Sequence, residues 1–359
     1  MAEALGELAA EGITLQELRL AGRNHAMPLE ALRFPVTPVG LHYLLIHYDV
    51  PVVDPAAWRL SIGGRVEREL SLGLDDVRAR PAAELTVTME CAGNGRAHLD
   101  PRPVSQPWLD EAVGTARWRG MPLRPLLEEA GVGEGAVEVV FTGLDRGVEK
   151  GIDQHYQRSL RLGEALRDEV LLAYEMNGAP LPPQHGFPLR LVVPGWYGMT
   201  NVKWLASIEV VDRPFDGYQQ AWAYHLRQAE DERGEPLDRM LPRSLIVPPG
   251  IPDFHTRERS VERGEHVLEG RAWSGRAPVE GVEVSADGGV TWARAELEPE
   301  EHRWAWRGWR FRWSAEPGRH VLCSRARDGT GNEQPLEPQW NLGGYANNTV
   351  QTVVVNVTG

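Results

Sequence analysis

The chain has 359 residues, of which 42% are hydrophobic and 25% are charged, and its formal net charge is −13. This composition is typical of a globular protein of about two domains and excludes a disordered chain. No run of 18 apolar residues occurs, so we expect no membrane span. So acidic a chain is a poor candidate for general nucleic-acid binding, which requires a positive surface.

The sequence of the first 230 residues predicts short helices and strands that do not follow a regular βαβ alternation. A short helix followed by an extended segment is expected within residues 1–30, and further helices at 70–79, 122–130 and 162–167. Strands are expected at 57–66, 84–90, 137–143, 189–193 and 204–211. This mixture favours an α+β domain with a mixed sheet over a doubly wound fold.

The composition changes near residue 228, where a charged run without apolar periodicity is followed by several prolines. From residue 245 onward, short alternating runs separated by turns such as Asp287-Gly288-Gly289 predict an immunoglobulin-like β-sandwich. We therefore expect one domain at 1–230, a linker at 231–244 and an all-β domain at 245–359.

The N-terminal sequence MAEALGELAAEGITLQEL carries acidic residues where a secretory signal requires a basic segment and an apolar core. This pattern predicts a cytoplasmic protein. A periplasmic location is the alternative if an export signal has been removed.

The basic residues are almost all arginine, since Lys150 and Lys203 are the only two lysines. Any anion site in this chain would therefore be built largely from guanidinium groups. Such groups bind oxyanions through paired hydrogen bonds.

Cys91 follows the strand predicted at 84–90 and opens the segment CAGNGR. The two glycines and the asparagine favour a tight loop in which the backbone approaches a ligand closely. A thiolate on such a loop, beside Arg96, is a nucleophile or a metal ligand; the alternative is an inert buried cysteine. The only other cysteine, Cys323, alternates with apolar residues, so we expect it to pack in the core.

Two further segments carry candidate groups. HGFPLRLVVPGWYG (185–198), with Lys203 shortly after it, can present His185, Arg190 and Lys203 toward one anion. A structural histidine and a solvated lysine are the competing interpretations. In GRNHAMP, an extended chain places Arg23 and His25 on one face, and an exposed polar loop is the competing interpretation.

Together these segments resemble the sulfite oxidase family, from about Arg23 to the C-terminus. The motifs of its molybdenum domain are CAGNGR, TARWRG (115–120), LLAYEMNG (171–178), HGFPLRLVVPGWYG and VKWL (202–205). Those of its dimerisation domain are WSG (273–275), VSADGGVTW (284–292) and WNLGGY (340–345).

The resemblance implies a role for each matching residue. Cys91 would bind molybdenum through its thiolate. Arg23 and Arg96 would hold sulfite, and Tyr224 would be the active-site tyrosine, with Tyr218 as a weaker candidate. The contacts to the pterin cofactor would come from Arg23, Asn24, His25, Asp145, His185, Arg190, Asn201, Val202 and Lys203.

The implied activity is the oxidation of sulfite to sulfate by oxygen-atom transfer from Mo(VI), in a homodimer that passes electrons to an external acceptor such as cytochrome c. No haem is expected in this chain. Gly343 stands where the family often has an arginine of the anion pocket. This departure leaves open a related molybdoenzyme that acts on another oxyanion or sulfur compound, or a reductase. The residues alone also allow a binding protein without metal and a thiol enzyme using Cys91 with His185.

Overall fold

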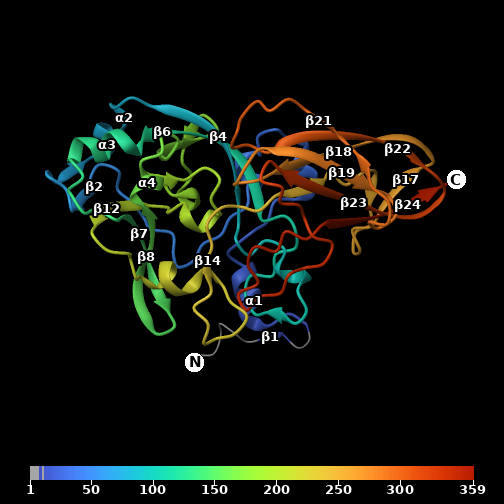
Figure 1. The fold of residues 1–359 in the computed structure, drawn as a ribbon, viewed down its shortest axis with the longest axis horizontal. Helices are drawn as coiled ribbons and strands as arrows, with labels where there is room; N and C mark the ends of the chain where they lie inside the picture. The colour runs from blue at the N-terminus through green and yellow to red at the C-terminus, as the bar shows by residue number, and fades with distance from the viewer. Residues whose placement is uncertain (1–7, 10–11) are drawn as a thin grey trace.

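The computed structural model describes residues 8–9 and 12–359, which form two parts lying side by side (Figure 1). The first part has two five-stranded sheets with short helices, and the second is a sandwich of a four-stranded and a six-stranded sheet. The predicted α+β domain followed by a β-sandwich is confirmed. Within the described residues, no helix is long and apolar enough to cross a bilayer.

The first sheet carries the segment that leads to Cys91. Its strand order is β10-β9-β6-β4, all neighbours antiparallel, with β11 pairing with β9. The strands are β4 (Ala83–Glu90), β6 (Val113–Pro122), β9 (Leu171–Met176), β10 (Ala179–Pro180) and β11 (Arg190–Val192). The last five residues of β4 are buried, so the strand delivers Cys91 into the interior.

The second sheet has the order β3-β2-β12-β7-β8. Its strands are β2 (Leu60–Gly64), β3 (Leu70–Leu72), β7 (Glu138–Glu149), β8 (Ile152–Arg161) and β12 (Leu205–Val211). β12 is parallel to β2 and antiparallel to β7, so the sheet is mixed as expected. β7 and β8 form a long hairpin that projects from the body of the molecule (Figure 1).

The helices are short: α1 (Leu15–Ala21), α2 (Leu74–Arg78), α3 (Leu123–Ala130) and α4 (Leu162–Ala165). α3 buries Leu123, Leu126, Leu127 and Ala130 on one face and ends at Gly131 with φ +71°, a conformation that favours glycine. The helix predicted at 70–79 is wrong in its first half, because residues 70–72 pair with β2 as strand β3.

The sandwich begins at Arg243, inside the range expected to be linker. Its sheets have the orders β15-β18-β22-β21 and β16-β17-β24-β23-β19-β20. The strands are β15 (Arg243–Ile246), β16 (Ile251–Pro252), β17 (Arg259–Glu262), β18 (Gly264–Trp273), β19 (Val279–Ser285), β20 (Ala293–Arg294), β21 (Glu296–Leu297), β22 (Arg307–Ala315), β23 (Gly318–Asp328) and β24 (Gln351–Thr358). Cys323 is 1% exposed on β23, in the interior of this domain.

Smaller elements connect these sheets. Two short pairs, β1–β5 (Leu8–Ala9 with Arg102–Pro103) and β13–β14 (His225–Leu226 with Glu235–Pro236), lie outside them. The 3-10 helices are η1 (Leu29–Arg33), η2 (Val39–Leu41), η3 (Arg96–His98), η4 (Pro183–His185) and η5 (Gly198–Thr200), and η6 (Gln219–Ala223) is a π-helix.

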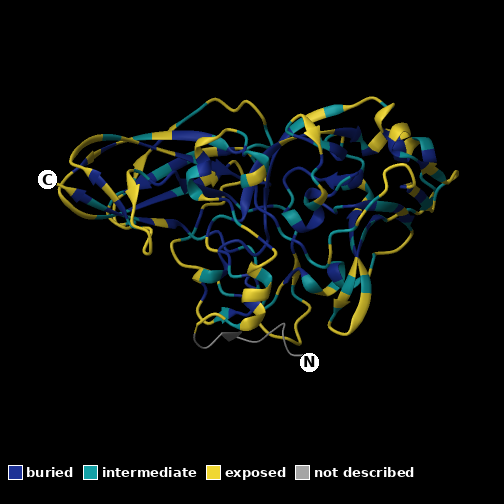
Figure 2. Ribbon diagram, turned by 180° about the vertical axis from the view of Figure 1, so that it is seen from behind, coloured by how far each residue is buried: buried dark blue, intermediate teal, exposed yellow. Residues whose placement is uncertain are grey.

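The two parts share a continuous core. Leu245, Trp273 and Trp306 of the second part pack with Met27, Tyr197 and other buried residues of the first. Figure 2 shows buried residues gathered where the parts meet. The sandwich therefore forms one wall of the region that contains Cys91.

Candidate active site

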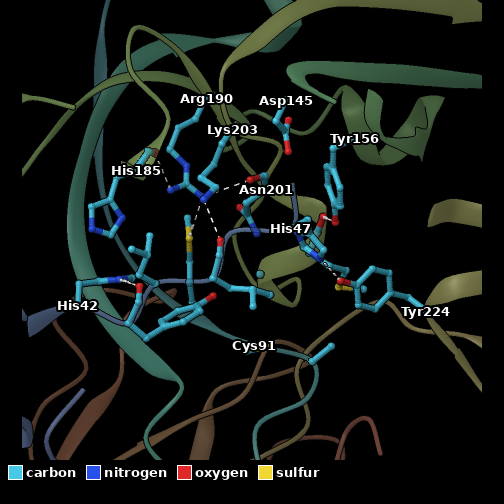
Figure 3. A pocket seen from close by; sticks show the side chains of 17 residues that line it. His42, His47, Cys91, Asp145, Tyr156, His185, Arg190, Asn201, Lys203 and Tyr224 are labelled. Carbon is cyan, nitrogen blue, oxygen red and sulfur yellow. Dashed lines mark hydrogen bonds between the residues drawn. The ribbon is translucent and has the colours of Figure 1, made fainter. Parts of the chain in front are cut away.

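An inner cavity brings together side chains from distant parts of the sequence (Figure 3). Seven predicted site residues line it: Cys91, Asp145, His185, Arg190, Asn201, Lys203 and Tyr224. Among its other lining residues are His42, His47 and Tyr156, which the sequence did not single out. The run HYLLIHY at 42–48 is a sequence signal for His42 and His47, because it is rich in histidine and aromatic residues.

Cys91 is fixed at the end of β4 by backbone hydrogen bonds. Its N–H donates to the carbonyl of Ala112 at 2.9 Å, and its carbonyl accepts from Asn94 N at 3.0 Å. The Asn94 side chain returns to the same segment and accepts from Ala112 N at 3.0 Å. Burial raises the pKa of the Cys91 thiol, although the nearby Arg96 acts in the opposite direction.

Arg190 is a buried cation that has no carboxylate partner within residues 12–359. Its Nη1 donates to the carbonyl of His185 at 3.1 Å and its Nη2 to the carbonyl of Asn201 at 3.2 Å. The guanidinium carbon lies 4.6 Å from the centre of the Trp118 ring. Burial lowers the pKa of Arg190 to about 10, and its Nε has no partner among the described residues.

Lys203 and Asp145 face the same cavity. Lys203 Nζ donates to the carbonyls of Leu45 at 2.8 Å and Gln184 at 3.1 Å. Burial, with the charge of Arg190, lowers the pKa of Lys203 to about 7. Burial raises the pKa of Asp145 to about 6, and its Oδ1 has no partner among the described residues.

The three histidines of the inner cavity are held uncharged. Burial is the largest cause: it lowers the pKa of His42 to about 4, of His47 to about 3 and of His185 to about 2. Neighbouring cations, Arg190 for His42 and Lys203 for His47, lower these values further. The positive charge of the cavity therefore comes from Arg190 and from Lys203 in its protonated form.

Tyr224 is hydrogen-bonded to His47, whose Nε2 lies 2.5 Å from the phenol oxygen. Because His47 is uncharged, its Nε2 can accept a hydrogen bond from the O–H of Tyr224. The His47 ring lies 4.5 Å from that of Tyr156, which donates to the carbonyl of Met199 at 2.6 Å. Burial raises the pKa of Tyr224 well above its ordinary value.

An outer cleft adjoins the inner cavity. Cys91, Tyr224, Leu45 and His47 line both, so the thiol lies where they meet. The outer cleft also contains Arg23 and Arg96. This geometry gives a small molecule a path from solvent to Cys91.

Arg96 reaches this junction by lying across the Cys91 loop. Its Nη1 donates to Gln106 O at 2.9 Å and its Nε to Gly343 O at 3.0 Å, and its guanidinium carbon lies 5.3 Å from the centre of the Tyr345 ring. A Cβ at Gly93 would lie 2.5 Å from Arg96 Nη2, so a larger residue at 93 would displace the Arg96 guanidinium. A Cβ at Gly343 would lie 2.3 Å from the Tyr345 ring, so an arginine at 343 would displace Tyr345.

Residues 23–25 form hydrogen bonds to residues 44–47 and hold that segment in place. Arg23 donates from Nε to Ile46 O and from Nη2 to His47 O, each at 3.2 Å. Asn24 Oδ1 accepts from Ile46 N at 2.7 Å, and the backbone of His25 pairs with Leu44. Neither Asn24 nor His25 lines the inner cavity or the outer cleft. They hold the segment 44–47, in which Leu45 and His47 line both the inner cavity and the outer cleft.

Two other predicted residues lie away from the inner cavity. The Val202 side chain is fully buried in the core of the first part, and its carbonyl accepts from Leu191 N at 2.8 Å. Tyr218 lines a smaller pocket with Gly343 and Tyr345. Tyr224, not Tyr218, faces Cys91.

The sandwich domain clamps the Cys91 loop. Arg243 is 1% exposed, and it donates from Nη1 to Glu90 Oε1 at 3.1 Å and from Nη2 to Asp110 Oδ1. Trp273 Nε1 donates to Glu90 Oε2 at 2.9 Å. Asn347 Nδ2 donates to the carbonyl of Gly95 at 2.7 Å. The residues on both sides of Cys91 are therefore fixed by the second part of the chain.

The chain matches two domain families in succession. The oxidoreductase molybdopterin binding domain matches residues 47–219, and the Mo-co oxidoreductase dimerisation domain matches residues 243–358. The first match covers His47 and the predicted cofactor contacts from Asp145 to Lys203. The second begins at Arg243.

Several characterised proteins are similar to this chain. The mitochondrial sulfite oxidase of Rattus norvegicus is 37% identical over 90% of this chain, which spans 62% of that protein. The sulfite oxidase of Gallus gallus is 38% identical over 89% of this chain, which spans 73% of it. A nitrate reductase of Hordeum vulgare is 33% identical over 95% of this chain, which spans 42% of it.

A solved structure shares the whole fold. The structure of the sulfane dehydrogenase SoxCD from Paracoccus pantotrophus has a TM-score of 0.81 with 26% identity. The match covers 100% of this chain and 91% of that one.

Proposed function

The chain belongs to the sulfite oxidase family of molybdopterin-dependent oxidoreductases, and we propose that it oxidises sulfite to sulfate and passes the electrons to a separate acceptor such as cytochrome c. The observation that carries this proposal is the meeting of a deep, cation-lined cavity and an arginine-containing cleft at Cys91.

The residues of the inner cavity fit a molybdenum cofactor. A thiolate from Cys91 is a suitable soft ligand for molybdenum. Arg190 Nε and Asp145 Oδ1 are buried polar atoms that have no partner in the described part of the chain, so they are available to a polar organic group. Arg190 and Lys203 supply positive charge for its phosphate. When bound, the cofactor supplies the oxygen transfer and the two-electron redox change.

The protein's own residues would bind and orient the substrate. Arg96 lies beside Cys91 at the junction of the two cavities and can hold a sulfite oxygen by a charge-assisted hydrogen bond. Tyr224, fixed by its bond to His47, presents its phenol to the same space. Arg23 acts through the 46–47 backbone that it binds and adds positive charge to the cleft.

We predict that Arg96→Met lowers kcat/KM for sulfite about 10- to 100-fold, because a charge-assisted hydrogen bond contributes about 1.5–3 kcal/mol. The assay is steady-state sulfite oxidation with ferricyanide and with cytochrome c, on protein shown to contain molybdenum. Arg119→Met, on the exposed face of β6, removes the same charge and should leave kcat/KM unchanged. Normal sulfite kinetics in Arg96→Met would contradict this account of the pocket.

A less charged sulfur substrate is the second candidate. Arg96 and Arg23 each commit two donors to backbone carbonyls, and Gly343 brings no cation. Leu45 and Tyr345 add neutral surface beside them. The similar SoxCD structure is described as a sulfane dehydrogenase. Faster turnover of a small sulfane compound than of sulfite would favour this candidate, and reduction of nitrate would contradict both.

We also propose that the chain forms a homodimer through residues 245–359, since the second part matches a dimerisation domain. Light scattering at micromolar concentration should give twice the mass of one chain. A single-chain mass at that concentration would contradict the proposal.

A further inference from the structure

Arg158 is a buried cation that the proposed mechanism does not use. It lies on β8, is 1% exposed, and lines neither the inner cavity nor the outer cleft. Its Nη1 donates to the carbonyl of Gln219, in η6 just before Tyr224. Its guanidinium carbon lies 5.5 Å from the centre of the Tyr224 ring. Arg158 therefore contacts both the ring of Tyr224 and the backbone that carries it.

Within the described residues, Arg158 forms no ion pair, and its Nε has no hydrogen-bond partner. Glu138 is near enough to interact with its charge. The Glu138 carboxylate is instead bonded by Ser159 Oγ at 2.7 Å and by Phe215 N at 3.0 Å. A guanidinium buried without a counter-ion carries a large desolvation penalty, so its retention calls for a compensating role.

The other buried arginines each have an explanation. Arg243 is paired with two carboxylates, and Arg259 is paired with Glu30. Arg96 and Arg190 line the cleft and the inner cavity. Arg158 is the remaining buried arginine of the described chain, and its guanidinium lies against the ring of Tyr224, which lines the inner cavity.

We propose that Arg158 is a positioning residue that holds Tyr224 in place and supplies, from behind its ring, the positive charge for a small oxyanion that Gly343 does not provide. This inference rests on the proposed function, because it assumes that the anion binds on the cavity side of Tyr224. A unit charge acting over roughly 8–12 Å at an effective dielectric of about 20 changes anion affinity about 10- to 30-fold.

The test compares Arg158→Met with Arg158→Lys in molybdenum-loaded protein. Equilibrium dialysis with radiolabelled sulfate gives anion affinity without turnover, and sulfite kinetics give kcat and KM. Arg158→Met should weaken sulfate binding and raise KM for sulfite about 10- to 30-fold, with a smaller effect on kcat. Arg158→Lys, which keeps the charge, should recover most of the affinity. Arg119→Met again controls for net charge.

Far-UV circular dichroism and the Tm of each variant establish folding. If Arg158→Met does not fold, Arg158→Gln takes its place with the same expectation, because an amide can still donate to the Gln219 carbonyl. Unchanged sulfate affinity in the neutral variant, equal losses in the neutral and lysine variants, or no sulfate binding by the unmodified protein would each overturn the proposal. Sulfate binding that depends on Arg158 without sulfite turnover would instead contradict the proposed function alone.

Discussion

Cys91→Ser should abolish sulfite turnover and molybdenum retention while leaving the fold intact. The serine hydroxyl is a harder and weaker ligand than a thiolate, so the metal loses its protein ligand. The loop itself should persist, because backbone hydrogen bonds hold residue 91 to Ala112 and Asn94. Molybdenum content by mass spectrometry, sulfite kinetics and the Tm together measure these three outcomes.

Cys323→Ser is the matched control, since Cys323 is the only other cysteine and lies on β23 of the sandwich. It should retain molybdenum and activity, with at most a loss of stability from its buried position. Full activity in Cys91→Ser, or equal loss of molybdenum in the two variants, would contradict the role of Cys91 as metal ligand.

Arg243→Met should destabilise the protein by about 3–5 kcal/mol, because it leaves two buried carboxylates without their cation. The side chains of Arg243, Glu90 and Asp110 are 1%, 4% and 10% exposed in this pair of bridges. Since Glu90 directly precedes Cys91, the variant should also lose activity. Chemical denaturation followed by circular dichroism measures the stability.

The ion pair of Arg65 with Asp212 provides the comparison, because its side chains are 51% and 48% exposed. Arg65→Met should change the free energy of unfolding by no more than about 1 kcal/mol and leave activity intact. If both variants lower stability equally, the buried bridge does not hold the two parts together as described.

Elements with strong local patterns could be predicted from the sequence. The alternation of TVTME predicts β4, and the proline and leucines of 122–130 predict α3. By contrast, β8 (Ile152–Arg161) carries a mixed polar sequence and becomes a strand through its pairing with β7. Arg243 stands in a stretch whose sequence is typical of a linker, yet it is buried against Glu90 and Asp110. Its burial could not be predicted locally, because both partners lie more than 130 positions away in the sequence.

The residues of the candidate site likewise divide into those that local motifs predict and those that depend on distant contacts. Motifs with distinctive spacing, around Cys91 and from His185 to Lys203, identify residues that do line the inner cavity. His47 and Tyr156 lie outside these motifs, and only the fold shows their contacts with distant residues or rings. The Arg23-Asn24-His25 motif lies outside the inner cavity and supports the neighbouring segment that lines it.

The clamp on the Cys91 loop has a consequence for how the protein is made. Gly95 and Asn347, which hold each other at the loop, are 252 positions apart. At 5–20 residues per second, a ribosome needs roughly 10–50 s to travel between them. Throughout that interval the Cys91 loop of the nascent first domain lacks its contact with Asn347. If Cys91 is the metal ligand, as proposed, we expect the cofactor to enter the finished site after translation, and we expect a chain that ends before residue 347 to bind it poorly.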